Sequence, residues 1–588
     1  MLYPTLAEMN TSREWLDVFN GYNHNLRIGE GEFYEMTNLS SDNFPILSPR
    51  SKRGVYASPE KPQGLVSKDS LCYVDGGDFV INKYRVSDVV TERVFMGLAA
   101  DDTPKTLISM GAKVIIMPDK KYINTEDLTD FGDIEATVVT AGTVTFSLCK
   151  VDGVEYENTV TQSTVPPTPK NMDLWLDTSS VPHTLKQYSS SSGMWSAIAT
   201  TYIKIHAYGI GSPFNANDGV TISGIESAAL ADLNASTTIW AKGDDFIVVT
   251  GILDKVTTQT KPVTVSRKMP NMDFIIESGN RLWGCRYGVA LNGEVVNEIY
   301  ASKLGDFKNW NSFPGISTDS YVVSVGTDGQ FTGAITHLGY PLFFKENCVH
   351  KVYGNYPANY QVQTTSLRGV QKGCERSLAI VNEVLYYKAR SSICAYDGSL
   401  PVEISSALGD MKYSNAVAGS LGNKYYISMQ DINGDYHLFV YDTLKEMWHR
   451  EDDTEAIDFC NCRGDLYFID RADNQIKTVR GTGDATEDNI RWEAVTGIIG
   501  TDSPDKKYIS RMDVRMKLDV GARVSFYAEY DSSGEWEHLF TTTPSKSLRS
   551  FSAPIRPQRC DHLRLKLVGE GDAKIFSICK TVEWGSDG

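Results

Sequence analysis

The 588-residue sequence lacks the short motifs by which common enzymes and metal proteins are recognised. Its nine histidines are spread singly and form no HExxH, HxH or Cys/His cluster. It contains neither the GxSxG pattern of a nucleophile elbow nor the glycine-rich lysine motif of a phosphate-binding loop. We therefore predict no catalytic, cofactor-binding or metal-binding residue, and no enzymatic activity.

A calcium loop is only half present. Asp431, Asn433 and Asp435 in DINGD are spaced like its first half, but the glutamate that closes an EF-hand loop is missing. The Asn433-Gly434 pair explains the same stretch as a two-residue hairpin. We predict a turn here.

The chain also lacks a targeting or spanning segment. Its start, MLYPTLAEMN, has no basic region followed by an apolar one, and no apolar run approaches the ~20 residues of a spanning helix. These absences predict a protein without a membrane-spanning segment that is made in a cytoplasm.

Positive charge is in deficit. The 57 Lys and Arg residues face 74 Asp and Glu residues, a formal net charge of −17. Proteins that grip nucleic acid through its phosphates are usually basic. The charge therefore excludes a strong DNA binder, although DNA could still pass along a surface that repels it weakly.

Cysteines are scattered and form no CxxC pair. The closest two, Cys460 and Cys462, lie two residues apart in a predicted strand and so share one face of it. Reduced core thiols are the favoured interpretation, with a zinc or redox site as the alternative.

What the sequence has in abundance is short strands. Glycine or asparagine turns join apolar and aromatic strands in seven units, which begin near residues 71, 107, 274, 335, 378, 416 and 457. Asp75-Gly76-Gly77 and Gly422-Asn423 supply the positive φ that tight hairpins need. Repeated self-contained meanders predict a β-propeller; an array of sandwiches is the alternative.

Changes in pattern divide the chain into five parts. We predict an N-terminal strap or platform segment (1–60), the first propeller blades (61–123), an inserted all-β domain (124–265), the remaining blades (266–484) and a C-terminal β-sandwich (485–588). The fold class is thus all-β.

One basic stretch, NFPILSPRSKRG (43–54), stands out in the acidic chain. Its two prolines disfavour helix, so that we expect an extended strap. Its cations would then face a carboxylate-bearing partner or, alternatively, carboxylates of their own chain. The candidate docking residues are Pro45, Pro49, Arg50, Lys52 and Arg53.

The stretch FNGYNHNLRIGEGEFYEMTNLSSDNFPILSPRSKRG (19–54) combines Gly-x-Asn, an acidic Gly-Glu region and a Pro-x-L-x-x-R close. Further on, YPLFFKENCVHKVYG and GCERSLAIVNEVLYYKARSSICAYDGSLPVEISSAL (373–408) read as propeller blades. Together they resemble tail hub, tail nozzle and packaged-DNA stabilisation proteins of short-tailed bacteriophages. The likeness covers residues 15–55 and about 270–480.

The resemblance implies a structural virion protein in the phage tail. Six copies would form a ring, a nozzle or hub, beneath the portal and its adaptor, with tail fibre or tailspike proteins as further partners. The ring would retain packaged double-stranded DNA and form the channel for genome ejection, without binding DNA specifically. Loops at about 165–195 or 208–220 would gate that channel.

Two other functions stay open. Trp- and Tyr-rich segments such as DLWLDT and RLWGCRYG favour a tail-associated protein that binds or cleaves carbohydrate, and glycoside hydrolysis needs only two correctly separated carboxylates. YSSSSGMW (188–195) and YDSSGEW (530–536) are incomplete versions of the turn found in sialidase propellers, and we interpret them as exposed hairpins. A cellular propeller scaffold is the third possibility, although Gly-His and Trp-Asp repeat signatures are missing.

Overall fold

The computed structural model describes residues 11–84, 89–157, 159–290, 293–481, 487–500, 508–543, 548–555 and 557–583. Its secondary structure consists of β-strands and four short 3-10 helices, η1 (Ala228–Leu233), η2 (Pro357–Asn359), η3 (Glu375–Ser377) and η4 (Ser406–Leu408). The predicted all-β class is confirmed.

The chain forms two compact units. Unit 1 holds residues up to 107, 343–349 and 364 onward, and unit 2 holds residues 108–342 and 350–363. Unit 2 contains the insert and most of the two sheets that flank it along the chain.

Seven sets of four antiparallel strands follow the seven repeats that the sequence predicts. Six sets are separate four-stranded sheets, and the remaining set, the sixth blade, belongs to a ten-stranded sheet. Blades one to three are β7 (Pro62–Ser67), β8 (Leu71–Asp75), β9 (Asp78–Tyr84), β10 (Val89–Phe95); β11 (Thr106–Met110), β12 (Lys113–Met117), β13 (Lys121–Asn124), β14 (Phe131–Asp133); and β28 (Phe274–Ser278), β29 (Arg281–Val289), β30 (Val295–Ala301), β31 (Tyr321–Ser324). Blades four to six are β32 (Phe331–His337), β33 (Tyr340–Lys345), β34 (Cys348–Tyr353), β35 (Gln361–Ser366); β36 (Ala379–Val381), β37 (Val384–Lys388), β38 (Ile393–Tyr396), β39 (Val402–Glu403); and β40 (Ser414–Leu421), β41 (Lys424–Gln430), β42 (Tyr436–Asp442), β43 (Met447–Arg450).

The seventh blade joins distant parts of the sequence. It is built from β44 (Ala456–Cys462), β45 (Asp465–Asp470) and β46 (Gln475–Thr478), and its fourth strand is β6 (Gly54–Ala57). Val55 pairs with Lys477 and Gly54 with Thr478. A strand from the N-terminal segment thus completes the last blade, which confirms the propeller.

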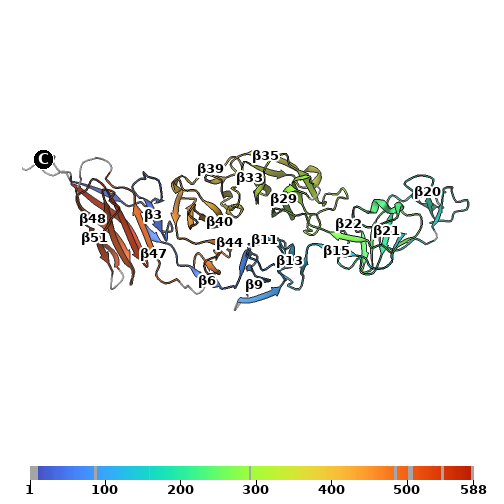
Figure 1. The fold of residues 1–588 in the computed structure, drawn as a ribbon, viewed down its shortest axis with the longest axis horizontal. Helices are drawn as coiled ribbons and strands as arrows, with labels where there is room; N and C mark the ends of the chain where they lie inside the picture. The colour runs from blue at the N-terminus through green and yellow to red at the C-terminus, as the bar shows by residue number, and fades with distance from the viewer. Residues whose placement is uncertain are drawn as a thin grey trace, which may run out of the picture. The chain divides into compact units, whose positions relative to one another are not determined.

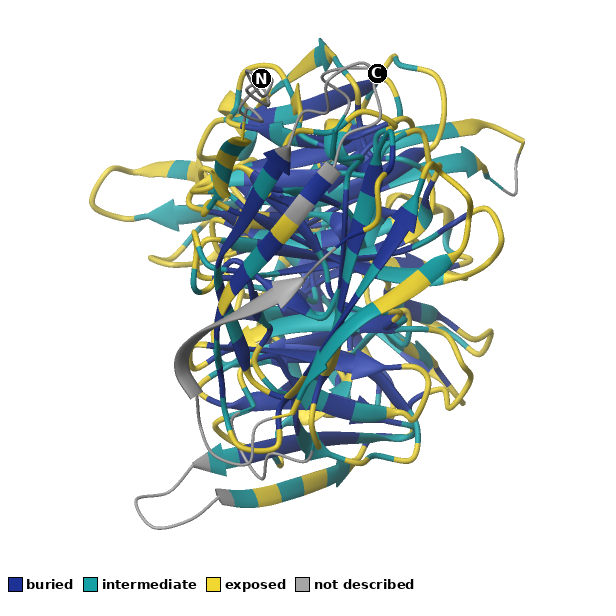
Figure 2. Cartoon of the chain, turned by 90° about the vertical axis from the view of Figure 1, so that its left-hand side faces the viewer, coloured by how far each residue is buried: buried dark blue, intermediate teal, exposed yellow. Residues whose placement is uncertain are grey.

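Tight turns produce the meanders as the sequence predicts. Gly76, between β8 and β9, has φ +58°, and Gly422, between β40 and β41, has φ +57°. A residue with a Cβ is strained in this left-handed conformation, so that glycine favours these turns. In Figure 2 the strands are mainly dark blue and the turns mainly yellow, as expected when hairpins carry buried strands between exposed loops.

The sandwich takes strands from both ends of the chain. One sheet has the order β1-β53-β48-β51, and the other contains β2, β3, β47, β52, β49 and β50 and continues through β43 into the sixth blade. The bounds are β1 (Thr11–Leu16), β2 (Gly21–Tyr22), β3 (Glu32–Thr37), β47 (Arg491–Thr496), β48 (Tyr508–Leu518), β49 (Arg523–Tyr530), β50 (Trp536–Thr542), β51 (Leu548–Ile555), β52 (Leu563–Glu570) and β53 (Ala573–Glu583). Residues 1–60 and 485–588, predicted as separate parts, therefore contribute to one sandwich.

The insert runs from β15 to β27 and is all-β, as predicted. Its three sheets consist of β15 (Ala136–Val139), β27 (Thr264–Arg267), β22 (Gly219–Ser223), β23 (Ser236–Thr238); β24 (Ala241–Gly243), β25 (Phe246–Thr250), β21 (Tyr202–His206), β16 (Val144–Cys149), β26 (Thr257–Gln259); and β17 (Val160–Gln162), β18 (Leu174–Asp177), β19 (Thr184–Ser189), β20 (Met194–Ala197). Buried side chains of the first two sheets, among them Phe146, Ile203 and Val265, form one core. Within the insert, Figure 1 shows β20 at the tip, beyond β21 as seen from β15.

The cysteines lie where the favoured interpretation puts them. Nine of the ten are buried and Cys460 is half-buried. Cys460 and Cys462 both pack into the cluster that contains Tyr467 and Ile469, so that they share one face of β44 as predicted. Burial raises the pKa of the Cys72 thiol to about 12, so this group stays protonated at neutral pH.

Candidate functional site

The predicted docking segment is extended only in part. Residues 42–45, which include Pro45, form turns, and Phe19 N–H donates to the Pro45 carbonyl at 3.2 Å. Pro49 lies in β5 (Ser48–Pro49), which pairs with β4 (Leu39–Ser40). The expectation of an extended strap is therefore right for Leu47 onward and wrong for the preceding turn.

Two of the three predicted docking cations are buried in unit 1. Arg50 makes two bonds to the Glu487 carboxylate, at 2.8 and 3.0 Å, and Arg53 donates to Glu451 at 2.9 Å. Asp452 lies between them, 2.5 Å from Arg53 Nη1 and 3.6 Å from Arg50 Nη2. The cations thus pair with carboxylates of their own chain, which is the alternative that the sequence left open.

The charges in the cluster of Arg50, Arg53, Glu451, Asp452 and Glu487 stabilise one another. Burial alone would lower the pKa of Arg53, but the carboxylates of Asp452 and Glu451 raise it above its usual range. Burial alone would likewise raise the pKa of Asp452, whereas Arg53 and Arg50 lower it. Both groups therefore remain charged at neutral pH, and the cluster is an internal ion network.

Lys52 differs from its two neighbours because it is half-exposed. It lines a hollow of about 460 Å³ together with Lys517 and Lys574, whose charges are balanced by Asp42, Asp519 and Asp572. Partner docking through the strap stays a prediction, and Lys52 is its most accessible cation.

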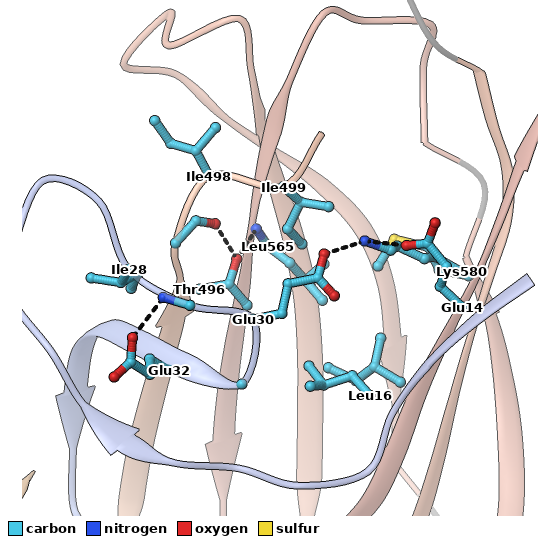
Figure 3. Close-up of a pocket in the computed structure, with 15 residues that line it drawn as sticks. Glu14, Leu16, Ile28, Glu30, Glu32, Thr496, Ile498, Ile499, Leu565 and Lys580 are labelled. Carbon is cyan, nitrogen blue, oxygen red and sulfur yellow. Dashed lines mark hydrogen bonds and ion pairs between the residues drawn. The ribbon is translucent and has the colours of Figure 1, made fainter. Parts of the chain in front are cut away.

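A second pocket in unit 1 is apolar and lies where the N-terminal strand meets the sandwich (Figure 3). Leu16, Ile28 and Leu565 contribute to its walls, and Lys580 pairs at its edge with Glu14 at 2.8 Å and with Glu30. Its volume of about 40 Å³ has room for only a few water molecules. Its lining comes from β1, β48 and β53 in one sheet, from β47 and β52 in the other, and from residues 28–32, and we interpret it as a packing gap between the two sheets of the sandwich.

The DINGD stretch is a turn, as predicted. The Asp431 carboxylate accepts from Asn433 N–H at 2.8 Å and from Asp435 N–H at 3.0 Å, and Gly434 has φ +97°. His437 lies 3.3 Å from the same carboxylate. Backbone and imidazole nitrogens thus surround the Asp431 carboxylate, and these contacts explain the stretch as a hairpin turn.

The most distinctive surface group lies in the tip module of the insert, β17–β20. Strand alternation places Leu174, Leu176 and Leu185 on the face that packs inward. Trp175, Lys186, Tyr188 and Trp195 lie on the other face. These side chains form an aromatic group on the outer face of the module, within unit 2.

The rings of this surface touch one another. Trp195 stands edge-on to Trp175 at 5.5 Å between centroids and is tilted against Tyr188 at 5.3 Å. Lys186 Nζ lies 4.6 Å above the Trp175 ring and also pairs with Asp177 at 2.8 Å. Trp175 is buried beneath its neighbours, whereas Trp195 and Tyr188 remain half-exposed.

Polar groups and exposed methionines border the rings. The Ser189 and Ser191 hydroxyls lie 2.9 Å apart in the turn that joins β19 to β20, and Asn171 accepts from Ser190 N–H at 3.0 Å. Met172 and Met194 are both more than 60% exposed. Aromatic, polar and exposed apolar groups therefore occur together at this tip.

The proposed gate loops fall into different environments. Residues 165–195 include β18, β19 and part of β20, so that much of this range is sheet. In 208–220, Asp218 is buried, pairs with Arg267 and accepts from Asn309 Nδ2 at 3.1 Å. That network fixes the base of the insert to the β30–β31 connection, and gating by either range stays a prediction.

Within the ranges that the structure describes, no three His, Cys, Asp or Glu side chains are grouped to hold a metal ion. None of the described helices is long and apolar enough to cross a membrane.

No family model and no curated protein matches the sequence. Among solved structures, the chain is similar to an exo-β-1,3-galactanase from Phanerochaete chrysosporium (9% identity, 52% of this chain and 94% of that chain, TM-score 0.22). It is also similar to PorZ, a surface component of the type IX secretion system of Porphyromonas gingivalis (10%, 88% and 82%, TM-score 0.26). A third match is the sialidase of Trypanosoma rangeli in complex with sialic acid (10%, 97% and 95%, TM-score 0.21).

These matches correct one prediction. The sequence predicts that the chain is not an enzyme, but two of the structures named above are enzymes, a galactanase and a sialidase, and we withdraw that prediction. At about 10% identity the likeness concerns the β fold, and it carries no substrate or reaction over to this chain.

Proposed function

We propose that this chain is a tail-associated propeller protein of a bacteriophage that binds carbohydrate through the aromatic face of its insert. The observation that carries the proposal is the packing of the half-exposed Trp195 ring against both buried Trp175 and half-exposed Tyr188. The association with a phage tail is supported by the resemblance of residues 15–55 and about 270–480.

The aromatic face suits a sugar for a physical reason. An aromatic side chain offers a large apolar surface at low entropic cost because it has few rotatable bonds. The C–H faces of a sugar ring can pack on such a surface, while its hydroxyls bond to polar groups at the border. Ser189, Ser191 and Asn171 supply such groups beside Trp195.

The tip is also braced to hold these rings in place. Trp175 donates through Nε1 to the Gln162 carbonyl at 2.9 Å, and Lys186 is fixed by Asp177. Because the supporting side chains are already ordered, binding would cost little side-chain entropy at Trp195.

A glycan array probed with the full chain tests this function. We expect binding to bacterial surface glycans, and we expect Trp195→Ala to lower the affinity at least tenfold. Trp240→Ala is the matched control, because Trp240 is a partly exposed indole elsewhere in the insert, in contact with Tyr202. An array without hits, or an equal loss in both variants, would contradict the proposal.

The tail ring is a second candidate function. It is favoured by β1, which stands at the edge of its described sheet and exposes Trp15. An exposed edge strand with a large aromatic side chain is suited to pair with another subunit. In this proposal, six copies would line a DNA channel beneath portal and adaptor proteins, and the net charge of −17 would limit friction with DNA.

Mass measurement and negative-stain images of the chain, with and without a portal and adaptor, test the ring. We expect a closed assembly of six copies. A chain that stays monomeric in the presence of both partners would exclude this function.

A further inference from the structure

Three side chains at one edge of the sandwich form a linear hydrogen-bond relay. They come from the turn between β49 and β50, which begins at Asp531, and from the segment that leads into β52. Ser532 Oγ lies 2.7 Å from His562 Nε2, and His562 Nδ1 lies 3.0 Å from Asp561 Oδ2. This is the order in which serine hydrolases arrange nucleophile, base and orienting carboxylate.

The relay fixes the roles of the two imidazole nitrogens. The Asp561 carboxylate can only accept, so it favours the tautomer in which Nδ1–H donates to it and Nε2 accepts from the Ser532 hydroxyl. A neutral imidazole in this tautomer can take a proton from serine as the serine attacks an electrophile.

Backbone contacts lock the two segments against each other. Asp531 N–H donates to the His562 carbonyl at 3.0 Å. The Asp531 carboxylate in turn accepts from Asp561 N–H at 2.8 Å and His562 N–H at 3.3 Å. Because these bonds do not involve the relay side chains, the relay could be altered while the two segments stay together.

The serine is held in an uncommon conformation. Asp531 has φ +51° and Ser532 has φ +52°, in the left-handed region that glycine usually occupies. Side chains in that region cost about 1–2 kcal/mol each, and such residues gather at functional sites. Here the turn presents Ser532 to solvent, since the residue is exposed while His562 is half-buried behind it.

We propose that Ser532 is a nucleophile activated by His562 and that the site cleaves esters of small acyl groups. This activity lies in the sandwich and is independent of carbohydrate binding at the insert. Ser532 lies in an open turn whose residues 531–535 are all exposed, and an acyl group that needs no enclosing pocket suits such a site.

The reaction balances with water as the only co-reactant. Ser532 Oγ attacks the ester carbonyl carbon, and its proton passes to His562 Nε2. The bond from the carbonyl carbon to the alcohol oxygen breaks, and the alcohol leaves with the proton from His562. Water then attacks the acyl-serine while His562 takes one of its protons; the carboxylic acid departs and Ser532 recovers its hydroxyl proton.

Labelling of the full chain with a fluorophosphonate probe tests the nucleophile, and hydrolysis of p-nitrophenyl acetate tests turnover. We expect peptide mapping to find the label on Ser532. His562→Gln should slow labelling and hydrolysis at least tenfold, because general base catalysis commonly contributes 100-fold or more. Ser533→Ala is the matched control, since Ser533 is the exposed neighbour in the same turn, and it should label like the parent chain.

Asp561→Asn separates catalysis from structure. Asparagine can keep a hydrogen bond to His562 but favours the wrong tautomer, so that we expect labelling to fall at least tenfold while the melting temperature stays within a few degrees. Absence of label on Ser532, or unchanged labelling in both His562→Gln and Asp561→Asn, would overturn the proposal.

Discussion

The indole of Trp492 lies directly on the backbone of Gly569. The two residues are partners in the β47–β52 ladder, and a Cβ at position 569 would stand 2.0 Å from two atoms of the ring. Trp492 is buried and donates through Nε1 to the Gly571 carbonyl at 3.2 Å. The ring is thus fixed by packing and by a hydrogen bond.

Gly569→Ala should destabilise the sandwich by about 1–3 kcal/mol, the usual cost of forcing an extra methyl group into a packed core. Thermal unfolding measures the change. Gly288→Ala, in a strand where nothing lies within 4 Å of the added methyl group, should leave the melting temperature nearly unchanged. Equal effects of the two substitutions would show that the indole can move aside.

Arg53→Met should cost about 3–5 kcal/mol, because it leaves the buried Glu451 carboxylate and the partly buried Asp452 carboxylate without their closest cation. Lys52→Ser is the matched control and should change stability by no more than about 0.5 kcal/mol, since Lys52 is half-exposed. Denaturant unfolding compares the two variants. Arg53→Met with parental stability would mean that the cation serves a partner rather than the fold.

Stability should depend on pH through His449. Burial, helped by the charge of Lys424, lowers the pKa of His449 to about 3 from its usual 6.5. Below pH 6.5, His449 therefore binds a proton in the unfolded chain but stays neutral in the folded chain. The free energy of unfolding falls as the pH drops from about 6.5 toward 3. Unfolding measured between pH 7 and 5 should lose about 1.4 kcal/mol per pH unit below 6.5 from this group.

His449→Gln should flatten that slope. Asp452 and Glu487, whose pKa values are lowered in the folded chain, affect stability only at lower pH. Their stabilising negative charges are lost only as the pH falls below about 4.5. A slope between pH 7 and 5 that persists in His449→Gln would assign it to other groups.

Asp218→Ala should loosen the insert. It removes the buried partner of Arg267 and an acceptor of Asn309, and leaving an arginine buried without a carboxylate costs about 3–5 kcal/mol. Limited proteolysis should then cut at the base of the insert faster than in the parent chain. Asp232→Ala, at an exposed position of the same insert, should not change the cleavage rate.

Local chemistry made much of this fold predictable. Glycines such as Gly76 and Gly422 mark hairpins by their conformational freedom, and counting hairpins leads to seven blades. The strand pairings between the two ends of the chain have no such local sequence signal. Val55 meets Lys477, and Trp15 lies opposite Cys579, across hundreds of residues. Nothing in the composition of either strand reveals its partner.

The site residues, too, were predictable only where the local sequence carries a signal. Arg50 and Arg53 stand out as basic in an acidic chain, but their burial depends on Glu487, which only folding brings near. Ser532 and His562 were missed because they are 30 residues apart and fit no motif with fixed spacing. The sole signal was the turn YDSSGEW, which sequence reasoning explains equally well as a plain hairpin.

Because β6 closes the seventh blade, this blade can form only after most of the chain has been synthesised. Residues 54–57 emerge early, yet their partner strand is translated only after residue 474, and β1 waits longer still for β53. Until then the nascent chain carries two strands whose backbone groups can pair with any neighbour. Translation that halts before the last blade would therefore yield fragments prone to coaggregate, and full-length yield should improve when a chaperone shields the first 60 residues.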